Sequence, residues 1–262
     1  MKFGVLALDY DSQVVNSGRN EYSIVNIGSV VMRLMLEKLL VRMGIPQDEI
    51  IKINFYNLSS YDGEYVIVPI NMHWMQDTGN KKLFTMSKKI IPIFLSISLN
   101  DTNIDEQQAI FLRRFEPIGC RDERTMNVLR KNNIDAYLFG CISCILEKRT
   151  VEPKDGKVFF ADVPYAVKKF IPESMKKRIE FVEHEIPIEK LNGKTPEEYT
   201  RTIIKRYKNE ASLVVTSRFH GAIIGWALGI PVIVTNEAYT FRFSWIKKLF
   251  PFYTNKDFKN ID

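Results

Sequence analysis

Cysteine and histidine are scarce in this chain of 262 residues, which contains three of each. Three cysteines are too few for a disulfide framework and favour a reducing compartment. Cys141 and Cys144 have CxxC spacing, but no second Cys or His pair lies near them in the sequence. Without a second pair of ligands, we expect Cys141 and Cys144 to be small buried residues at a strand end rather than a zinc or redox site. No carboxylate cluster has metal-ligand spacing, so we expect no metal.

Long apolar runs are also missing, since none approaches the roughly 20 residues that a membrane-spanning helix needs. The N-terminal run KFGVLAL turns acidic at Asp9 and predicts a buried strand rather than a signal peptide. The net charge of +6 is modest and spread over lysine pairs. Such an excess favours anionic substrates or a membrane surface, and no nucleic-acid-binding motif accompanies it.

What the chain has in abundance is an alternation of apolar runs typical of buried parallel strands with segments of helical periodicity. We expect helices over residues 23–44 and 165–178, a strand over 180–186, and an irregular polar loop over 9–22. The polar, Pro- and Gly-containing stretch 147–157 predicts a domain boundary. The pattern therefore predicts an α/β protein with an N-terminal domain over 1–150 and a C-terminal domain over 151–262. Ligands in such folds bind beyond the C-terminal ends of the strands.

The segment VVTSRFHGAIIGWALGIPV (214–232) predicts a strand, a sharp turn and a helix. The turn holds Ser217, Arg218, His220 and Gly221. A helix N-terminus carries unpaired N–H groups and binds anions, glycine lets a ligand approach closely, and arginine offers a planar fork to phosphate or carboxylate. In this position a protonated His220 is disfavoured until a bound anion reverses the bias, which makes it a candidate acid. The alternative is a structural arginine beside a half-buried histidine.

A second strand-to-helix turn occurs in PIGCRDERTMNVLR (117–130), where Asp122 is a good N-cap. Arg121 in this turn is a candidate anion contact. The alternative is that Arg121 and Arg124 pair with Asp122 and Glu123 on a solvated helix start.

These two segments resemble the hallmark motifs of the polysaccharide pyruvyl transferase family, and the likeness extends over most of the chain. The resemblance implies two Rossmann-like halves facing a cleft, as in GT-B glycosyltransferases. It also implies transfer of pyruvate from phosphoenolpyruvate to two hydroxyls of a saccharide as a cyclic ketal. Phosphoenolpyruvate would be the donor substrate, and no cofactor is expected.

By the same resemblance, Arg218 and His220 are the catalytic candidates that hold the donor anion, with Ser217, Gly221 and Arg121 as substrate contacts. Where relatives often carry Gly-Asp in the first half, this chain has Asn26-Ile27-Gly28-Ser29, so Asn26 and Gly28 are substrate-binding candidates.

Catalysis also needs a base for the acceptor hydroxyl, and the sequence does not single one out. Asp9, Asp11 and Glu21 in the first polar loop are candidates, as is His73. Trp74 beside it is a candidate to stack on a sugar ring. For His73 and Trp74, core packing at a strand end is an equal alternative. We expect His184 to be structural.

The acceptor implied by the resemblance is a capsule or exopolysaccharide precursor, either free or lipid-linked at the membrane surface. That function places the protein in the cytoplasm, or peripherally at the inner face of the membrane. Two other functions stay open, namely a GT-B glycosyltransferase that uses a nucleotide sugar and a non-catalytic family member.

Overall fold

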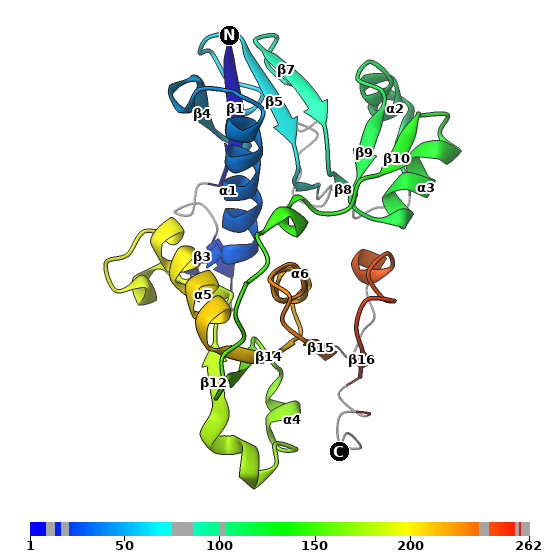
Figure 1. Cartoon of the computed structure of the whole chain (residues 1–262). Coiled ribbons are helices and arrows are strands. Elements are labelled where there is room, and N and C mark those ends of the chain that lie inside the picture. The colour runs from blue at the N-terminus through cyan, green and yellow to red at the C-terminus, as the bar shows by residue number, and fades with distance from the viewer. Residues whose placement is uncertain are drawn as a thin grey trace. The chain divides into compact units, whose positions relative to one another are not determined.

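The computed structural model describes residues 1–8, 14–16, 21–74, 86–99, 103–235, 241–254 and 257. The chain forms two compact units, each with its own parallel sheet (Figure 1). The first unit comprises Met1–Asp9 and Met32–Ile142, and the second comprises Tyr10–Val31 and Ser143–Asp262. The expected mixed α/β class with parallel sheets is confirmed.

The main sheet of the first unit has the strand order β4-β1-β5-β7, with all neighbours parallel. Its strands are β1 (Lys2–Ala7), β4 (Ile50–Asn54), β5 (Val66–Ile70) and β7 (Ile90–Phe94). Helix α1 (Ile27–Arg42) packs on β1, where Leu36 and Leu40 form a buried cluster with Val5. The chain leaves α1 through Gly44, whose φ of +89° is the left-handed conformation that glycine adopts without strain.

Shorter elements follow in the first unit. They are β6 (His73–Trp74), β8 (Ser98–Leu99), α2 (Glu106–Arg113), β9 (Ile118–Cys120), α3 (Glu123–Lys131) and β10 (Ala136–Leu138). Asp122 caps α3 as predicted, because its Oδ1 accepts a hydrogen bond from the Thr125 N–H at 2.8 Å.

The second unit contains a five-stranded parallel sheet in the order β12-β11-β14-β15-β16. Its strands are β11 (Lys157–Ala161), β12 (Ile179–Val182), β14 (Ala211–Thr216), β15 (Val232–Thr235) and β16 (Phe252–Tyr253). The helices of this unit are α4 (Tyr165–Lys168), α5 (Pro196–Glu210) and α6 (Phe219–Ala227). Helix α5 begins with a capping box, in which Thr195 and Glu198 exchange hydrogen bonds.

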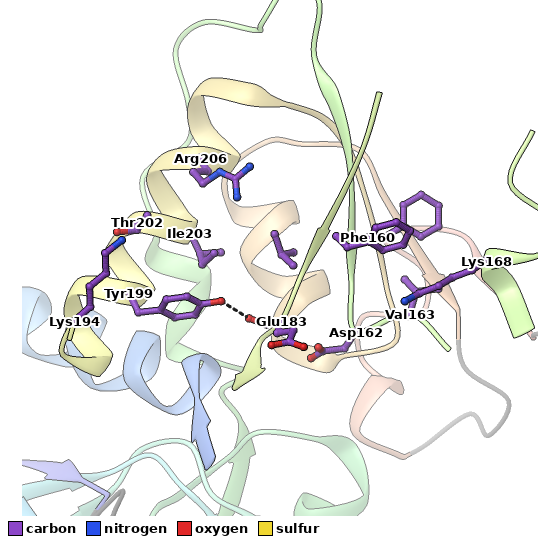
Figure 2. A pocket seen from close by; sticks show the side chains of 12 residues that line it. Phe160, Asp162, Val163, Lys168, Glu183, Lys194, Tyr199, Thr202, Ile203 and Arg206 are labelled. Atoms are coloured by element: carbon purple, nitrogen blue, oxygen red, sulfur yellow. Dashed lines mark hydrogen bonds between the residues drawn. The ribbon is translucent and has the colours of Figure 1, made fainter. Parts of the chain in front are cut away.

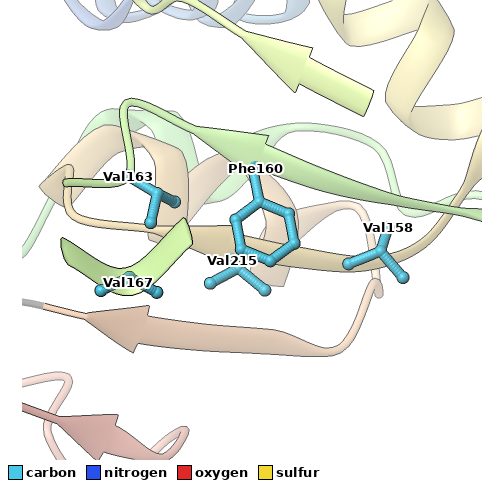
Figure 3. Close-up of a cluster of buried hydrophobic side chains, with 5 residues drawn as sticks. All are labelled: Val158, Phe160, Val163, Val167 and Val215. Carbon is cyan, nitrogen blue, oxygen red and sulfur yellow. The ribbon is translucent and has the colours of Figure 1, made fainter. Parts of the chain in front are cut away.

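Both faces of this sheet are covered, which explains the nearly continuous apolar runs of its strands. On one face, Phe160 and Val215 form a buried cluster with Val167 of α4 (Figure 3). On the other face, Tyr207 of α5 meets Phe159 edge-on, with ring centroids 5.0 Å apart. Helix α6 packs on the same face of the sheet as α5. Its Gly225 lies so close to β15 that an added Cβ would come within 2.7 Å of Val232.

A small antiparallel sheet in the second unit corrects two sequence predictions. Residues 21–26 form strand β3 (Glu21–Asn26), which pairs with β2 (Val14–Asn16) and with β13 (Glu185–Pro187). The predicted helix over 23–44 is therefore wrong for its first four residues, and the strand predicted over 180–186 is divided between β12 and β13. One partner of β3, the strand β13, lies about 160 residues away, so local periodicity does not reveal that pairing.

The same pairing bears on the domain organisation. The sequence places residues 10–31 in an N-terminal domain over 1–150, whereas these residues belong to the second compact unit. The helix predicted over 165–178 is also interrupted. It consists of α4 and a 3-10 helix at Glu173–Arg178, because Pro172 between them cannot continue an α-helix.

Candidate active site

The turn between β14 and α6 places Arg218, Phe219 and His220 at a helix N-terminus. Arg218 is the N-cap residue, and its side chain makes no capping hydrogen bond to the helix backbone. The Thr216 hydroxyl holds the turn, since it donates to the Ala161 carbonyl at 3.1 Å and accepts from the Arg218 N–H at 3.0 Å. Gly221 is required here, because a Cβ would lie 2.4 Å from the Thr216 hydroxyl oxygen. The first turn of α6 can therefore offer N–H groups to an anion.

The Arg218 guanidinium is held between two carboxylates that the sequence analysis missed. Its Nε donates to Asp162 Oδ2 at 3.1 Å, and its Nη2 lies 2.6 Å from Glu185 Oε2. The side chain is nevertheless 42% exposed, so part of its donor fork faces outward. The arginine is thus oriented by two partners and still accessible to an anionic ligand.

Asp162 connects several parts of the site. It follows β11 with a φ of +49°, a left-handed conformation that Asp tolerates better than most residues. Its carboxylate accepts the His184 N–H, and its carbonyl accepts the Ser217 hydroxyl at 2.6 Å. Burial raises the pKa of this carboxyl, although the Arg218 charge and the His184 N–H oppose the shift. An acidic residue directly after a strand was the signal available in the sequence.

Glu185 links Arg218 to the start of α1. The Asn26 amide donates to Glu185 Oε1 at 3.0 Å, while Asn26 Oδ1 accepts the Gly28 N–H at 2.9 Å. Asn26 therefore caps α1 and fixes Glu185 at the same time. Antiparallel pairing of β3 with β13 aligns Glu185 opposite Asn26 and so produces this contact.

His220 and Gly28 are in close contact. A Cβ built on Gly28 would lie 2.1 Å from His220 Nδ1 and 2.4 Å from its Cγ, so the imidazole ring occupies the space that a side chain would need. Gly28 is in the first turn of α1 and His220 is in the first turn of α6. Two helix N-termini, each with a partial positive charge, therefore meet at the imidazole ring.

A cavity of about 50 Å³ lies at this point, lined by Asn26, His184, Glu185, Arg218, Phe219, His220 and Arg242. Its size suits one or two water molecules, each of which takes about 30 Å³ in the liquid. Arg242 also lies over the Phe219 ring, 5.3 Å from its centroid. A ligand larger than a few atoms must enlarge this cavity or extend out of it along the exposed side of Arg218.

His184 is buried beside the cavity. Its Nε2 lies 2.8 Å from the Tyr207 hydroxyl oxygen. Burial and the Arg218 charge lower its pKa to about 3, so the imidazole is neutral at physiological pH. This geometry is that of a structural histidine.

Arg121 belongs to the first unit and is 1% exposed. Its Nη2 donates to the carbonyls of Asn71 and Ser96, and its Nε donates to the Ser96 hydroxyl at 3.3 Å. Neighbouring Asp122 is fully buried and accepts the Ser98 hydroxyl at 2.6 Å, so the alternative of a solvated helix start is wrong. Arg121 ties together the chain segments that follow β5, β7 and β9, and its substrate contact stays a prediction.

The remaining candidates are less defined. The backbone of His73 and Trp74 forms β6, which pairs with β8, and Glu21 begins β3. Asp9 and Asp11 lie outside the described residues. Among the residues that the structure describes, no group of three potential metal ligands occurs, and no helix is long and apolar enough to cross a membrane.

The second unit of this α/β protein thus brings together Asn26, Gly28, Ser217, Arg218, His220 and Gly221. The family model for polysaccharide pyruvyl transferase matches residues 26–238, so the chain belongs to that family. No curated protein sequence matches it.

Two solved structures align with this chain, and the first of them is similar in fold. An uncharacterized protein of Klebsiella pneumoniae subsp. pneumoniae aligns with a TM-score of 0.52 at 14% identity, over 97% of this chain and 93% of that one. Accessory secretory protein 1, 2 and 3 of Streptococcus pneumoniae aligns with a TM-score of 0.38 at 13% identity, over 86% of this chain and 49% of that one.

Proposed function

We propose that this family member transfers pyruvate from phosphoenolpyruvate to two hydroxyls of a saccharide, forming a cyclic ketal. The observation that carries the proposal is the meeting of two helix N-termini at His220 beside the oriented guanidinium of Arg218. Phosphoenolpyruvate carries roughly three negative charges near neutral pH, since the second phosphate pKa is about 6. Such a ligand requires several cationic or N–H donors in one place.

In this proposal the donor phosphate or carboxylate binds the exposed donors of Arg218 and the first-turn N–H groups of α6. Ser217 and Gly221 shape that turn, and Asn26 and Gly28 form the opposite wall. The cavity of about 50 Å³ admits only part of the ligand, so the rest extends along the exposed side of Arg218. No cofactor and no metal take part.

The reaction exchanges protons in a balanced way. Two acceptor hydroxyls lose one proton each, C3 of the enol gains one, and the departing phosphate takes the other. His220 protonates C3, and Arg218 with the helix N-terminus stabilises the phosphate as its bond to C2 breaks. The acceptor base is one of the candidates named from the sequence, and Arg121 is a further anion contact.

We further propose a GT-B-like arrangement, in which the first unit serves the acceptor and the second unit binds the donor. The acceptor would be a capsule or exopolysaccharide precursor, free or lipid-linked, reached from the cytoplasm at the inner face of the membrane. The family name supports a saccharide acceptor.

Titration calorimetry with phosphoenolpyruvate, UDP-sugars and CMP-sugars tests this function. We expect the protein to bind phosphoenolpyruvate in preference to the nucleotide sugars. Arg218→Lys should weaken this binding although it keeps the positive charge, because an ammonium lacks the planar fork of a guanidinium. Preferential binding of a nucleotide sugar would favour a glycosyltransferase, and absence of binding to all three would favour a non-catalytic protein.

A further inference from the structure

A groove of about 530 Å³ lies on the second unit, between the end of β12 and the first half of α5 (Figure 2). This volume is within the range of 300–1,000 Å³ that is typical of small-molecule sites, unlike that of the small cavity at His220. None of the functions assigned above uses this groove.

Aromatic rings supply part of the groove lining. The Tyr199 ring is fixed in place because its hydroxyl donates to the Glu183 carbonyl at 3.1 Å, the contact dashed in Figure 2. Phe181 is 53% exposed, and the Lys168 ammonium lies 4.5 Å from its ring centroid. The groove therefore presents apolar ring surface beside polar groups, which suits a ligand with both C–H and O–H groups.

The polar lining contains both hydrogen-bond acceptors and donors. Asp162 and Glu183 contribute carboxylates, and Lys168 and Lys194 contribute ammonium groups. These four formal charges cancel. Thr202 adds a hydroxyl, which donates to the Glu198 carbonyl at 2.7 Å and keeps its acceptor capacity.

The charges disfavour a polyphosphate ligand. The guanidinium of Arg206, the strongest phosphate-binding group in the lining, is held by Glu180 at 2.9 Å and by Glu210 at 3.4 Å. Glu183 adds a carboxylate that would repel a nucleotide diphosphate, whereas the carboxylate of Asp162 is already paired with Arg218 at 3.1 Å. A neutral polyol, by contrast, pairs its hydroxyls with carboxylates and ammonium groups alike.

Asp162 joins the groove to the proposed donor site, since its carboxylate lines the groove and also accepts Arg218 Nε at 3.1 Å. We propose that the groove binds sugar units of the acceptor saccharide other than those that the first unit serves, with a sugar ring against Tyr199 and Phe181 and hydroxyls on Asp162 and Glu183. This inference rests on the proposed function, because it names a binding site for part of that reaction's second substrate.

The experiment measures saccharide binding by the full chain on a broad glycan array without phosphoenolpyruvate, followed by calorimetry with the best glycan. Thr202→Trp places a large ring in the groove and should weaken glycan binding by about tenfold or more. Tyr199→Ala should do the same and serves if Thr202→Trp does not fold. The matched control is Lys205→Trp, an exposed position on the same helix outside the lining.

The outcomes separate this inference from the proposed function. Thr202→Trp should keep phosphoenolpyruvate affinity. If phosphoenolpyruvate binds but no glycan does, or if glycan binding survives in both groove variants, the groove is not the acceptor site. UDP binding that Thr202→Trp abolishes would also overturn the inference. Glycan binding without phosphoenolpyruvate binding would instead contradict the proposed donor.

Discussion

Replacing Gly28 with alanine should displace the His220 imidazole and thereby lower turnover. The new Cβ would lie 2.1 Å from His220 Nδ1, whereas ordinary van der Waals contact begins near 3.4 Å. The two groups must therefore separate by 3.4 − 2.1 = 1.3 Å. Misplacement of a reacting group by about 1 Å can cost about 10²-fold in rate, and this is the loss of turnover that we expect.

The effect on stability has two opposing parts. Alanine gains up to about 1 kcal/mol over glycine inside a helix, while overpacking a buried contact costs about 1–3 kcal/mol. We therefore expect a net loss of at most about 3 kcal/mol, measured by urea denaturation. Turnover is followed as phosphate release from phosphoenolpyruvate in the presence of a mixture of glycans.

Two controls make this prediction specific. Gly225→Ala creates a smaller overlap, with the new Cβ 2.7 Å from Val232, and should keep turnover because that contact lies away from the imidazole. In a His220→Ala background the contacts at 2.1 and 2.4 Å disappear and only the one to Cβ at 2.7 Å remains. Gly28→Ala should then cost less stability. Wild-type turnover in Gly28→Ala, together with a gain in stability, would refute the reasoning.

Three further predictions concern buried and charged groups. Arg121→Met should lower the free energy of unfolding by about 3–5 kcal/mol, because it removes a buried cation beside Asp122, and urea titration measures the loss. His184 takes up a proton below about pH 6.5 in the unfolded chain, whereas in the folded protein it stays neutral down to about pH 3. The free energy of unfolding therefore decreases as the pH falls through that range. Between pH 7.5 and pH 5 the wild type should lose about 2 kcal/mol more than His184→Asn, and equal losses would contradict this. Glu185→Gln removes a negative charge from Arg218 and should tighten phosphoenolpyruvate binding by about tenfold in calorimetry, whereas Glu183→Gln should change it little.

Local sequence signals predicted much of the fold. The apolar runs of β1 and β14, the turn between β14 and α6, and Asp122 as the N-cap of α3 each depend on neighbouring residues. The strand β3 was missed although it pairs with the nearby β2, and its other partner, β13, lies about 160 residues away. Residues 23–26 begin a longer apolar segment. The alternation of apolar and polar residues within these four positions does not show that they pair with a distant strand.

The candidate site shows the same division. Arg218 and His220 are on one turn, so their spacing was visible in the sequence, and Asn26 and Gly28 came from the family resemblance. Asp162 and Glu185 reach Arg218 from separate strands, and only the folded sheets bring them together. Burial of Arg121 could not be predicted either, because it depends on carbonyl groups at the ends of two other strands.

The most direct test of pyruvyl transfer follows the carbon atoms of the donor. The protein is incubated with ¹³C-labelled phosphoenolpyruvate and a mixture of glycans, and mass spectrometry then identifies which molecules carry the label. We predict that labelled pyruvate appears on a glycan with the release of one phosphate per transfer, and that Arg218→Lys abolishes both. The account is contradicted if no glycan acquires the label, or if glycans grow only when a nucleotide sugar is supplied.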